Sequence, residues 1–271
     1  ANTYASDRHQ FKKSIKEMPA VYEMLTDMKV NIEAARTLLY ETSRVFDIKE
    51  GIDLRIERHP ETKSDLRDDL KRYTAYSSLF TPIIKKFAAE MVNKVTYDAI
   101  QIHGGVGFTK EFNVERLYRD ARIIPIYEGT DQLQVIAAIG SVMTGVLFER
   151  LNEYESDFDF EPIKETFDTA KKLRNQLEMA VSHIKGKDES IYQEFHAGRL
   201  VEMGIDTVIS YLLCIDALRL ERKKAVAQLF ISKAKYQVKS KLDYILSDDI
   251  SLVNVHPDLI NHENPTAPAA S

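Results

Sequence analysis

The sequence contains one cysteine, Cys214, so no disulfide can form within the chain. Cys214 lies in the apolar run from Tyr211 to Leu218, which is a typical place for a small buried side chain. This cysteine usage favours a reducing compartment, and we expect a cytoplasmic location. No apolar stretch reaches the length of a transmembrane helix, so we expect no membrane association.

The sequence also lacks an excess of basic residues. Its net charge of −5 gives no general attraction to phosphate backbones, which argues against nucleic-acid binding. The seven histidines show no HxxxH or clustered spacing, so we predict no metal site. A short basic run is interpreted as a solvated turn between helices: Arg219, Arg222, Lys223 and Lys224.

Glycine and proline are scarce, at ten and eight among 271 residues, and the segments between them have helical periodicity. Apolar residues spaced three and four apart predict long amphipathic helices over 19–46 and 73–99. The polar stretch 47–69 is either an exposed loop or a weakly packed helical insertion. Thr81-Pro82 suits a helix start or a kink. One aromatic stripe is expected in the core or a subunit interface: Tyr73, Tyr76, Phe80 and Phe87.

The remaining segments complete an all-α prediction. The helical pattern breaks at 103–108, and Thr130 is expected to cap a helix that reaches about Arg150. We predict an up-and-down helical bundle over 1–152, a helical extension over 153–247 and an extended or disordered tail over 248–271. No segment reads as a strand. The other expected elements are a short helix over 114–120, a loop over 125–129, an acidic linker over 153–161, and helices over 162–184, 190–220 and 222–246.

The block from Asp98 to Gly140 carries the most chemical information. Its glycine cluster allows the backbone to approach a bulky group closely. The turn Ile126-Tyr127-Glu128-Gly129-Thr130 leads into a helix N-terminus, where free N–H groups favour negative charge. Glu128 could therefore reach into a cleft. The alternative is a glycine cap and a surface turn with Glu128 as a solvated side chain. His103 in the glycine turn is expected to make a local backbone hydrogen bond.

This block resembles the signature of acyl-CoA dehydrogenases, in which Q-x-x-G-G-x-G-[FY], R-D-A-[RK] and I-Y-E-G-T follow in this order and at this spacing. The segment from Tyr4 to Phe11 is similar to the family's Y-A-x-x-R-x-Q-F. Lys12 departs from the family, which has glycine at that position. The match spans about the first 145 residues. The polar insertion and the C-terminal extension resemble the longer bacterial members, such as 3-methylmercaptopropionyl-CoA dehydrogenase and its relatives.

The resemblance implies a reaction in which a double bond forms next to the carbonyl of an acyl-CoA thioester. Glu128 matches the base that removes the α-proton, and its backbone N–H would bond the thioester oxygen. The β-hydride would pass to FAD. The neighbouring Tyr127 and Gly129 would contact substrate. Some relatives place the base on a preceding helix instead, but the glutamate is retained here.

The resemblance also implies FAD contacts. Arg8 and Gln10 match residues that contact the flavin of a neighbouring subunit, with Arg8 donating to the pyrophosphate. For each position the alternative is a helix cap or a surface polar residue. The full set of expected cofactor residues is Arg8, Gln10, Phe11, Gln101, Gly104, Gly105, Thr130 and Gln132.

The expected partners are an acyl-CoA substrate, electron-transferring flavoprotein and further subunits of a homodimer or homotetramer. The family's N-terminal helical and middle β-domains are not in this sequence, so we expect the chain by itself to hold FAD weakly or not at all. The polar start does not form a signal peptide, and the missing initiator Met suggests an excised segment, although processing could also remove a Met. The rival interpretation is a non-catalytic relative used in DNA protection or protein interaction.

Overall fold

The computed structural model describes residues 1–187 and 190–261, and helices dominate it. The N-terminal half comprises α1 (Asn2–Asp7), β1 (His9–Gln10), β2 (Lys13–Ser14), η1 (Ile15–Glu17), α2 (Pro19–Arg58), η2 (Pro60–Thr62), α3 (Lys63–His103), α4 (Gly105–Phe108) and α5 (Val114–Ala121). The remainder comprises α6 (Asp131–Thr144), α7 (Val146–Asp157), η3 (Glu161–Ile163), α8 (Lys164–Lys185), α9 (Ser190–Arg219), α10 (Glu221–Leu246) and α11 (Ser251–Asn261).

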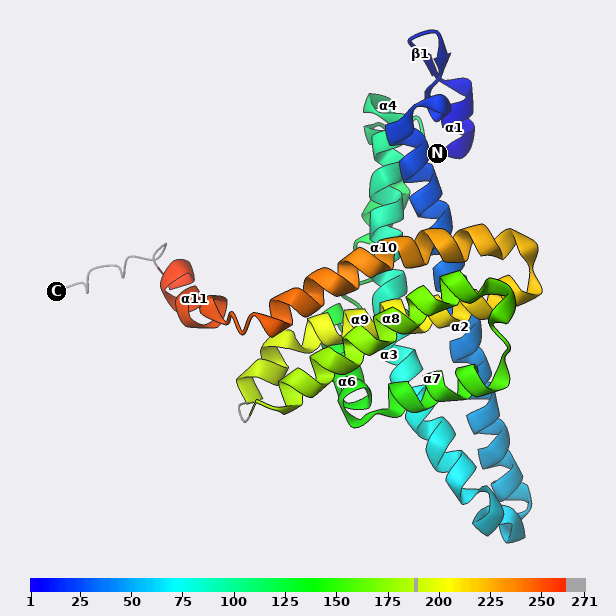
Figure 1. The fold of residues 1–271 in the computed structure, drawn as a ribbon. Coiled ribbons are helices and arrows are strands. Elements are labelled where there is room, and N and C mark those ends of the chain that lie inside the picture. Colours follow the sequence, from blue (N-terminus) through cyan, green and yellow to red (C-terminus); the bar gives the residue numbers. More distant parts are fainter. Residues whose placement is uncertain (188–189, 262–271) are drawn as a thin grey trace, which may run out of the picture.

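Helices α2 and α3 form a long hairpin that passes through the whole molecule (Figure 1). At a rise of about 1.5 Å per residue each helix is roughly 60 Å long. Helices α8, α9 and α10 pack together and cross this hairpin, so both of its ends project beyond them (Figure 1). Residues along the hairpin and at its ends are therefore the candidates for a functional site.

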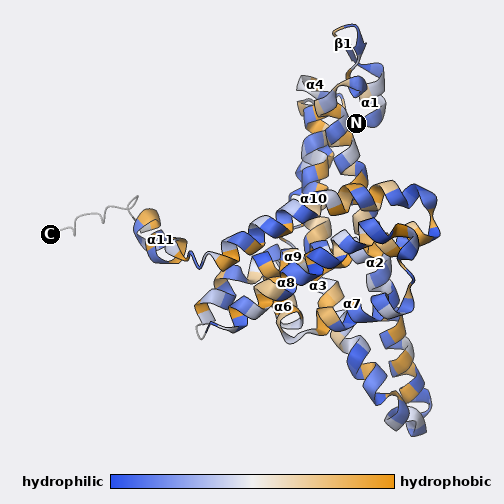
Figure 2. Ribbon diagram, in the orientation of Figure 1, coloured by the Kyte–Doolittle hydropathy of each residue, from blue (hydrophilic) through white to orange (hydrophobic). Residues whose placement is uncertain are grey.

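Helix α9 lies at the centre of the packing. It contacts α2, α3, α6, α7, α8 and α10, and apolar residues are buried on all its sides, as expected of a helix enclosed by others. Cys214 is buried there, as predicted. Tyr76 and Phe80 are fully buried in the same cluster, with Tyr73 and Phe87 packed against it, so the predicted core stripe is confirmed. Elsewhere, hydrophobic and hydrophilic residues alternate along the long helices (Figure 2).

The all-α class is confirmed, and most helix boundaries match the sequence-based prediction within a few residues. The core cluster continues from α2, α3, α6 and α7 into α8, α9 and α10. The division into a bundle over 1–152 and an extension over 153–247 stays a prediction.

The polar stretch 47–69 is helical except at the tip of the hairpin, so the helical-insertion alternative holds. The side chains of this stretch are good helix formers and make ion pairs such as Lys49–Asp53, 2.9 Å apart at i,i+4. The helix start proposed at Thr81-Pro82 is wrong, because α3 is continuous through Pro82. The carbonyl of Ser78 loses its helical donor there, but Ser78 is exposed and water can satisfy it.

Two further boundaries differ from the prediction. The helix capped by Thr130 ends at Thr144 instead of near Arg150, because Gly145 takes a φ of 100°. Helix α7 then occupies the first part of the predicted acidic linker. The predicted tail is helical over Ser251–Asn261, where the carboxylate of Asp249 accepts a hydrogen bond from the Ser251 N–H at 2.8 Å. Residues 262–271 of that tail lie outside the described residues.

The expectation of no strand is also wrong, because β1 and β2 pair in a two-residue hairpin near the N-terminus. The basic run between α9 and α10 is only partly solvated. Lys223 is buried, with its ammonium group 2.6 Å from Glu33 of α2 and 3.2 Å from Asp216 of α9. The hydrogen bond from Lys223 lowers the pKa of Glu33 to about 2. This pair joins α2 to the first turn of α10.

Candidate functional site

The segment that carries Glu128 is a compact turn between α5 and α6. The N–H of Tyr127 donates to the carbonyl of Ile123 at 3.1 Å, and the N–H of Asp131 donates to the carbonyl of Pro125 at 3.1 Å. Thr130 caps α6, as predicted, because its hydroxyl accepts from the Leu133 N–H at 3.4 Å. We call residues 123–131 the Glu128 turn.

The backbone of this turn is in the left-handed region at two consecutive residues. Gly129 has a φ of 90°, a backbone conformation that favours glycine, whereas the flexible amide of Gln134, 2.9 Å from an added Cβ, could move aside. Glu128 has a φ of 50°, which costs a non-glycine residue about 1–3 kcal/mol and persists only where the surroundings impose it. The turn therefore depends on contacts that hold it.

Lys85 of α3 provides such contacts, and sequence reasoning missed it. Its ammonium group donates to the carbonyl of Gly129 at 2.8 Å, to the carbonyl of Ile124 at 3.0 Å and to the carboxylate of Asp131 at 3.4 Å. It also lies 5.9 Å from the ring centroid of Tyr127. No sequence signal marked this residue, because Lys85 lies off the predicted apolar stripe of α3 and the adjacent Lys86 is charged as well.

The chemical groups of the turn itself remain available. The carboxylate of Glu128 is exposed and makes no hydrogen bond or ion pair with the part of the chain that the structure describes. In the same described part, the backbone N–H groups of Glu128, Gly129 and Thr130 donate no hydrogen bond. A carboxylate and free N–H groups thus stand together at the start of α6. Several large apolar side chains in or near this turn are also exposed: Ile123, Ile126, Tyr127, Leu133 and Ile136.

The glycine turn lies at the end of α3. Gly104 has φ 65° and ψ −144°, a conformation open only to glycine, and this ends the helix where the sequence predicts. His103 is buried, and its Nδ1 lies 2.6 Å from the carbonyl of Ala99, so the expected local hydrogen bond is confirmed. The ring of Tyr4 stacks on His103 at 4.5 Å. Gln101, Gly104 and Gly105 are exposed around this turn.

The β1–β2 hairpin projects from the same end of the molecule (Figure 1). Gln10 pairs with Lys13, so Phe11 and Lys12 form a two-residue loop with φ values of 50° and 67°. Positive φ at both residues is the pattern of a type I′ turn, which explains why glycine would be suited to the position of Lys12. Phe11 is 86% exposed. Arg8 lines a cavity of about 430 Å³ beside His103.

The structure thus divides the predicted cofactor residues into two groups. Arg8, Gln10 and Phe11 lie with Gln101, Gly104 and Gly105 at the end of the hairpin, whereas Thr130 and Gln132 lie at the start of α6. Gln101 is sixteen residues beyond Lys85 on α3, a separation of roughly 24 Å along the helix axis. Four of the predicted cofactor residues have polar side chains that make no hydrogen bond or ion pair within the described residues: Arg8, Gln10, Gln101 and Gln132.

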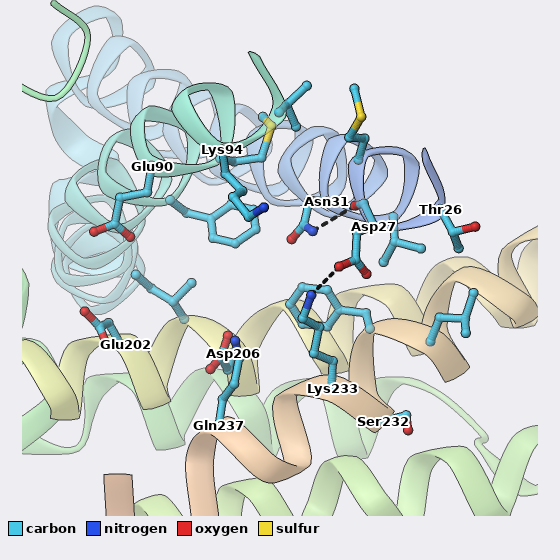
Figure 3. A pocket seen from close by; sticks show the side chains of 18 of the residues that line it. Thr26, Asp27, Asn31, Glu90, Lys94, Glu202, Asp206, Ser232, Lys233 and Gln237 are labelled. Atoms are coloured by element: carbon cyan, nitrogen blue, oxygen red, sulfur yellow. Dashed lines mark hydrogen bonds and ion pairs between the residues drawn. The ribbon is translucent and has the colours of Figure 1, made fainter. Parts of the chain in front are cut away.

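A separate cleft of about 560 Å³ opens between α2, α3, α9 and α10 (Figure 3), and we call it the central cleft. An ion pair between Asp27 and Lys233 crosses it. Asp206 extends into it without a side-chain hydrogen bond or ion pair in the described part of the chain, and burial raises the pKa of Asp206 to about 7. None of the predicted site residues lines this cleft.

The described residues contain no cluster of metal ligands and no single helix that could span a membrane. Over residues 1–187 and 190–261, no three His, Cys, Asp or Glu side chains gather as metal ligands. Among the helices of those ranges, none alone has the length and apolarity of a membrane span; α6 and α7 reach that threshold only as a pair, and the pair is bent by 64°.

Family models match nearly the whole described chain. The model for the acyl-CoA dehydrogenase C-terminal domain matches residues 1–57 and 66–142, and a second model, described as acyl-CoA dehydrogenase C terminal, matches residues 143–251. The first match includes both groups of predicted site residues. The second begins close to the predicted start of the extension.

Individual proteins give the same result. A subunit of the caffeyl-CoA reductase–Etf complex of Acetobacterium woodii is 35% identical over 52% of this chain and 30% of its own length. A probable acyl-CoA dehydrogenase of Mycobacterium bovis is 40% identical over 49% of this chain and 28% of its own length. The aligned part is therefore less than a third of these relatives.

A solved structure supports the fold. The crystal structure of an acyl-CoA dehydrogenase from Bacillus anthracis, complexed with FAD, superposes on 99% of this chain and 49% of its own chain. The TM-score is 0.71 at 19% sequence identity. This similarity extends over the C-terminal helices as well as the bundle.

Proposed function

Because this chain belongs to the acyl-CoA dehydrogenase family, we propose that it forms the C-terminal part of a flavin-dependent enzyme that oxidises the α,β carbon–carbon bond of an acyl-CoA thioester. Glu128 is the base in this proposal. The observation that carries it is the Glu128 turn, where a carboxylate and backbone N–H groups that have no partner among residues 1–187 and 190–261 stand on a restrained backbone.

The chemistry of the reaction explains why these groups belong together. The α-proton of a thioester is weakly acidic, so its removal needs an aligned base and stabilisation of the charge that develops on the carbonyl oxygen. The carboxylate of Glu128 would take the proton. The N–H of Glu128, which has no acceptor in the described residues, would donate to the thioester oxygen. Tyr127 and Gly129 would line the same part of the substrate site.

The exposed polar groups fit FAD in two places. Arg8, Gln10 and Phe11, with Gln101, Gly104 and Gly105, offer a cation, amides, a ring and bare backbone at one end of the molecule. Thr130 and Gln132 offer a hydroxyl and an amide near Glu128. FAD, when bound, would accept the β-hydride. Because roughly 24 Å of α3 separates the two groups, Arg8 would serve the flavin of a second subunit, and we propose a homodimer or homotetramer.

The names of the relatives bear on the direction of the reaction and on the electron partner. The Acetobacterium relative is a subunit of a caffeyl-CoA reductase–Etf complex, and a further relative, 32% identical over 52% of this chain and 30% of its own length, is a 3-(aryl)acrylate reductase of Clostridium sporogenes. By microscopic reversibility the residue that removes the α-proton in oxidation returns it in reduction. Glu128 would therefore have the same role in either direction, and electron-transferring flavoprotein is the electron partner that we propose.

Glu128→Gln in the full-length protein tests the proposal. The amide is nearly isosteric but cannot accept the proton, so turnover of an acyl-CoA should fall by about 10²–10⁴-fold. The flavin absorbance of the purified protein should be unchanged. Turnover close to that of the unsubstituted enzyme would contradict the assignment of Glu128 and indicate a base outside this chain.

A further inference from the structure

We infer that Lys85 is a positioning residue, whose ammonium group holds the Glu128 turn in the conformation that presents Glu128 to the substrate. The inference rests on the function proposed above for Glu128. It concerns a residue of α3 that is 43 positions away in the sequence and has no place in the motif that identified the site.

The donors of the Lys85 ammonium group match their acceptors in number. A lysine ammonium has three N–H donors, and Lys85 has three oxygen acceptors at 2.8, 3.0 and 3.4 Å. Two of them, the carbonyls of Ile124 and Gly129, lie on either side of Glu128 in the sequence. One rigid attachment point on a long helix therefore fixes both sides of the segment that carries the carboxylate.

The backbone conformation at Glu128 also needs a restraint. A φ of 50° at a glutamate is not its preferred state, so the chain needs external contacts to keep it. Gln134 supplies weak ones, at 3.3 Å to the carbonyl of Gly129 and 3.5 Å to that of Glu128. The Lys85 contact with Gly129 is shorter and is charge-assisted, which makes it the stronger restraint.

The neighbouring lysine, Lys86, has different partners from Lys85. Lys86 is only 4% exposed, yet its ammonium group pairs with Glu90 and Glu202, away from the turn. Lys86 therefore serves the packing of α3 against α9. The two lysines differ by one position on the same helix, so Lys86 is a matched control for Lys85.

The test compares three variants of the full-length protein. Lys85→Met keeps the length of the side chain but leaves the carbonyls of Ile124 and Gly129 without their donor. We expect kcat to fall about 10–100-fold while KM and FAD content change less than about threefold. Lys85→Arg retains the charge and multiple donors, so it should recover most of kcat. Lys86→Met should leave the kcat of the folded, flavin-loaded protein within about twofold.

A second measurement separates positioning from direct chemistry. The N–H of Asp131 closes the same turn through Pro125, so its hydrogen exchange reports whether the turn is held. Exchange in peptides covering 122–134 should become about tenfold faster in Lys85→Met and remain unchanged in Lys86→Met.

The outcomes distinguish this inference from the proposed function. Unchanged exchange in Lys85→Met would overturn the inference, whatever the activity, and so would faster exchange with normal kcat. If Glu128→Gln proved fully active, the proposed function would fail. Faster exchange in Lys85→Met would then show only that Lys85 holds the turn, and the inference about catalysis would fail as well.

Discussion

The central cleft and the Glu128 turn differ in the features by which functional sites are usually recognised. The cleft is concave, encloses about 560 Å³ between four long helices, and contains Asp206, whose pKa burial raises to about 7. The Glu128 turn is exposed, and its carboxylate has no partner among the described residues. By its shape and its perturbed pKa, the central cleft would be the better candidate for a functional site. The motif residues, and the backbone N–H groups that lack an acceptor in the described residues, instead favour the Glu128 turn.

The proposed function accounts for this difference through the share of its relatives that this chain spans. The aligned part of this chain covers 30% of the Acetobacterium relative and 28% of the Mycobacterium relative. A site that is formed by several domains lacks most of its lining when only one of those domains is considered. What each part can retain is a restrained backbone and unsatisfied donors and acceptors, and the Glu128 turn has both. The predictions below test whether this distinction holds.

Apart from the loss of Glu128 itself, a large effect on turnover is expected at Gly129. Gly129→Ala places a Cβ at a φ of 90°, a backbone conformation that alanine rarely adopts, so the Glu128 turn should shift. We expect kcat of the full-length enzyme to fall about 10–100-fold, because small displacements of a catalytic group are costly. Gly140→Ala is the control, since a Cβ there meets nothing within 4 Å. Normal turnover in Gly129→Ala would mean that the conformation of the turn does not matter.

The effect expected at Arg8, which belongs to the group of cofactor residues at the end of the hairpin, is on FAD affinity instead of turnover. Arg8→Met should weaken FAD binding to the full-length protein about 10–100-fold, the loss expected for one charge-assisted hydrogen bond. Arg58→Met, at the far end of the α2–α3 hairpin, should leave FAD affinity unchanged. Calorimetric titration measures both. The wild-type protein should be at least dimeric by light scattering; a monomer that retains FAD would contradict the role of Arg8 across an interface.

The sequence was most informative where structure is set by near neighbours. The cap at Thr130, the helix end at Gly104 and the helix boundaries from α8 to α10 all follow from local periodicity or from residues with restricted backbone preferences. The roles assigned to the individual site residues stay predictions. Their placement on two separate surfaces could not be read from spacing, because it depends on how far α3 carries the chain between them.

Three features escaped prediction for physical reasons. The β1–β2 hairpin turns at Phe11 and Lys12, which both take positive φ although neither is glycine, so no local signal marks the turn. The contact from Lys85 to Gly129 joins residues 44 positions apart. Asp206 lies on α9 among buried residues, and only the packing of four helices determines that its carboxylate faces the central cleft without a partner in the part of the chain that the structure describes.

The smallest effect is expected at Asp206 and concerns stability. Burial raises the pKa of Asp206 from 3.8 to about 7, so the folded state resists ionisation of this carboxyl group more than the unfolded state does. Its contribution to stability is therefore most favourable below pH 3.8 and is lost as the pH rises through about 7. Asp206→Asn removes the titration and should stabilise the protein at pH 8 but hardly at pH 4.

One pKa unit corresponds to about 1.4 kcal/mol, and the opening of the cleft to solvent reduces the full value, so we expect a gain of about 1–3 kcal/mol at pH 8. Urea unfolding of the full-length protein at both pH values measures it, with Asp243→Asn on the exposed surface of α10 as a control for the loss of a surface charge. Turnover of Asp206→Asn should equal that of the unsubstituted enzyme. A large loss of turnover, with FAD still bound, would place the central cleft inside the catalytic machinery and remove the distinction between the two regions.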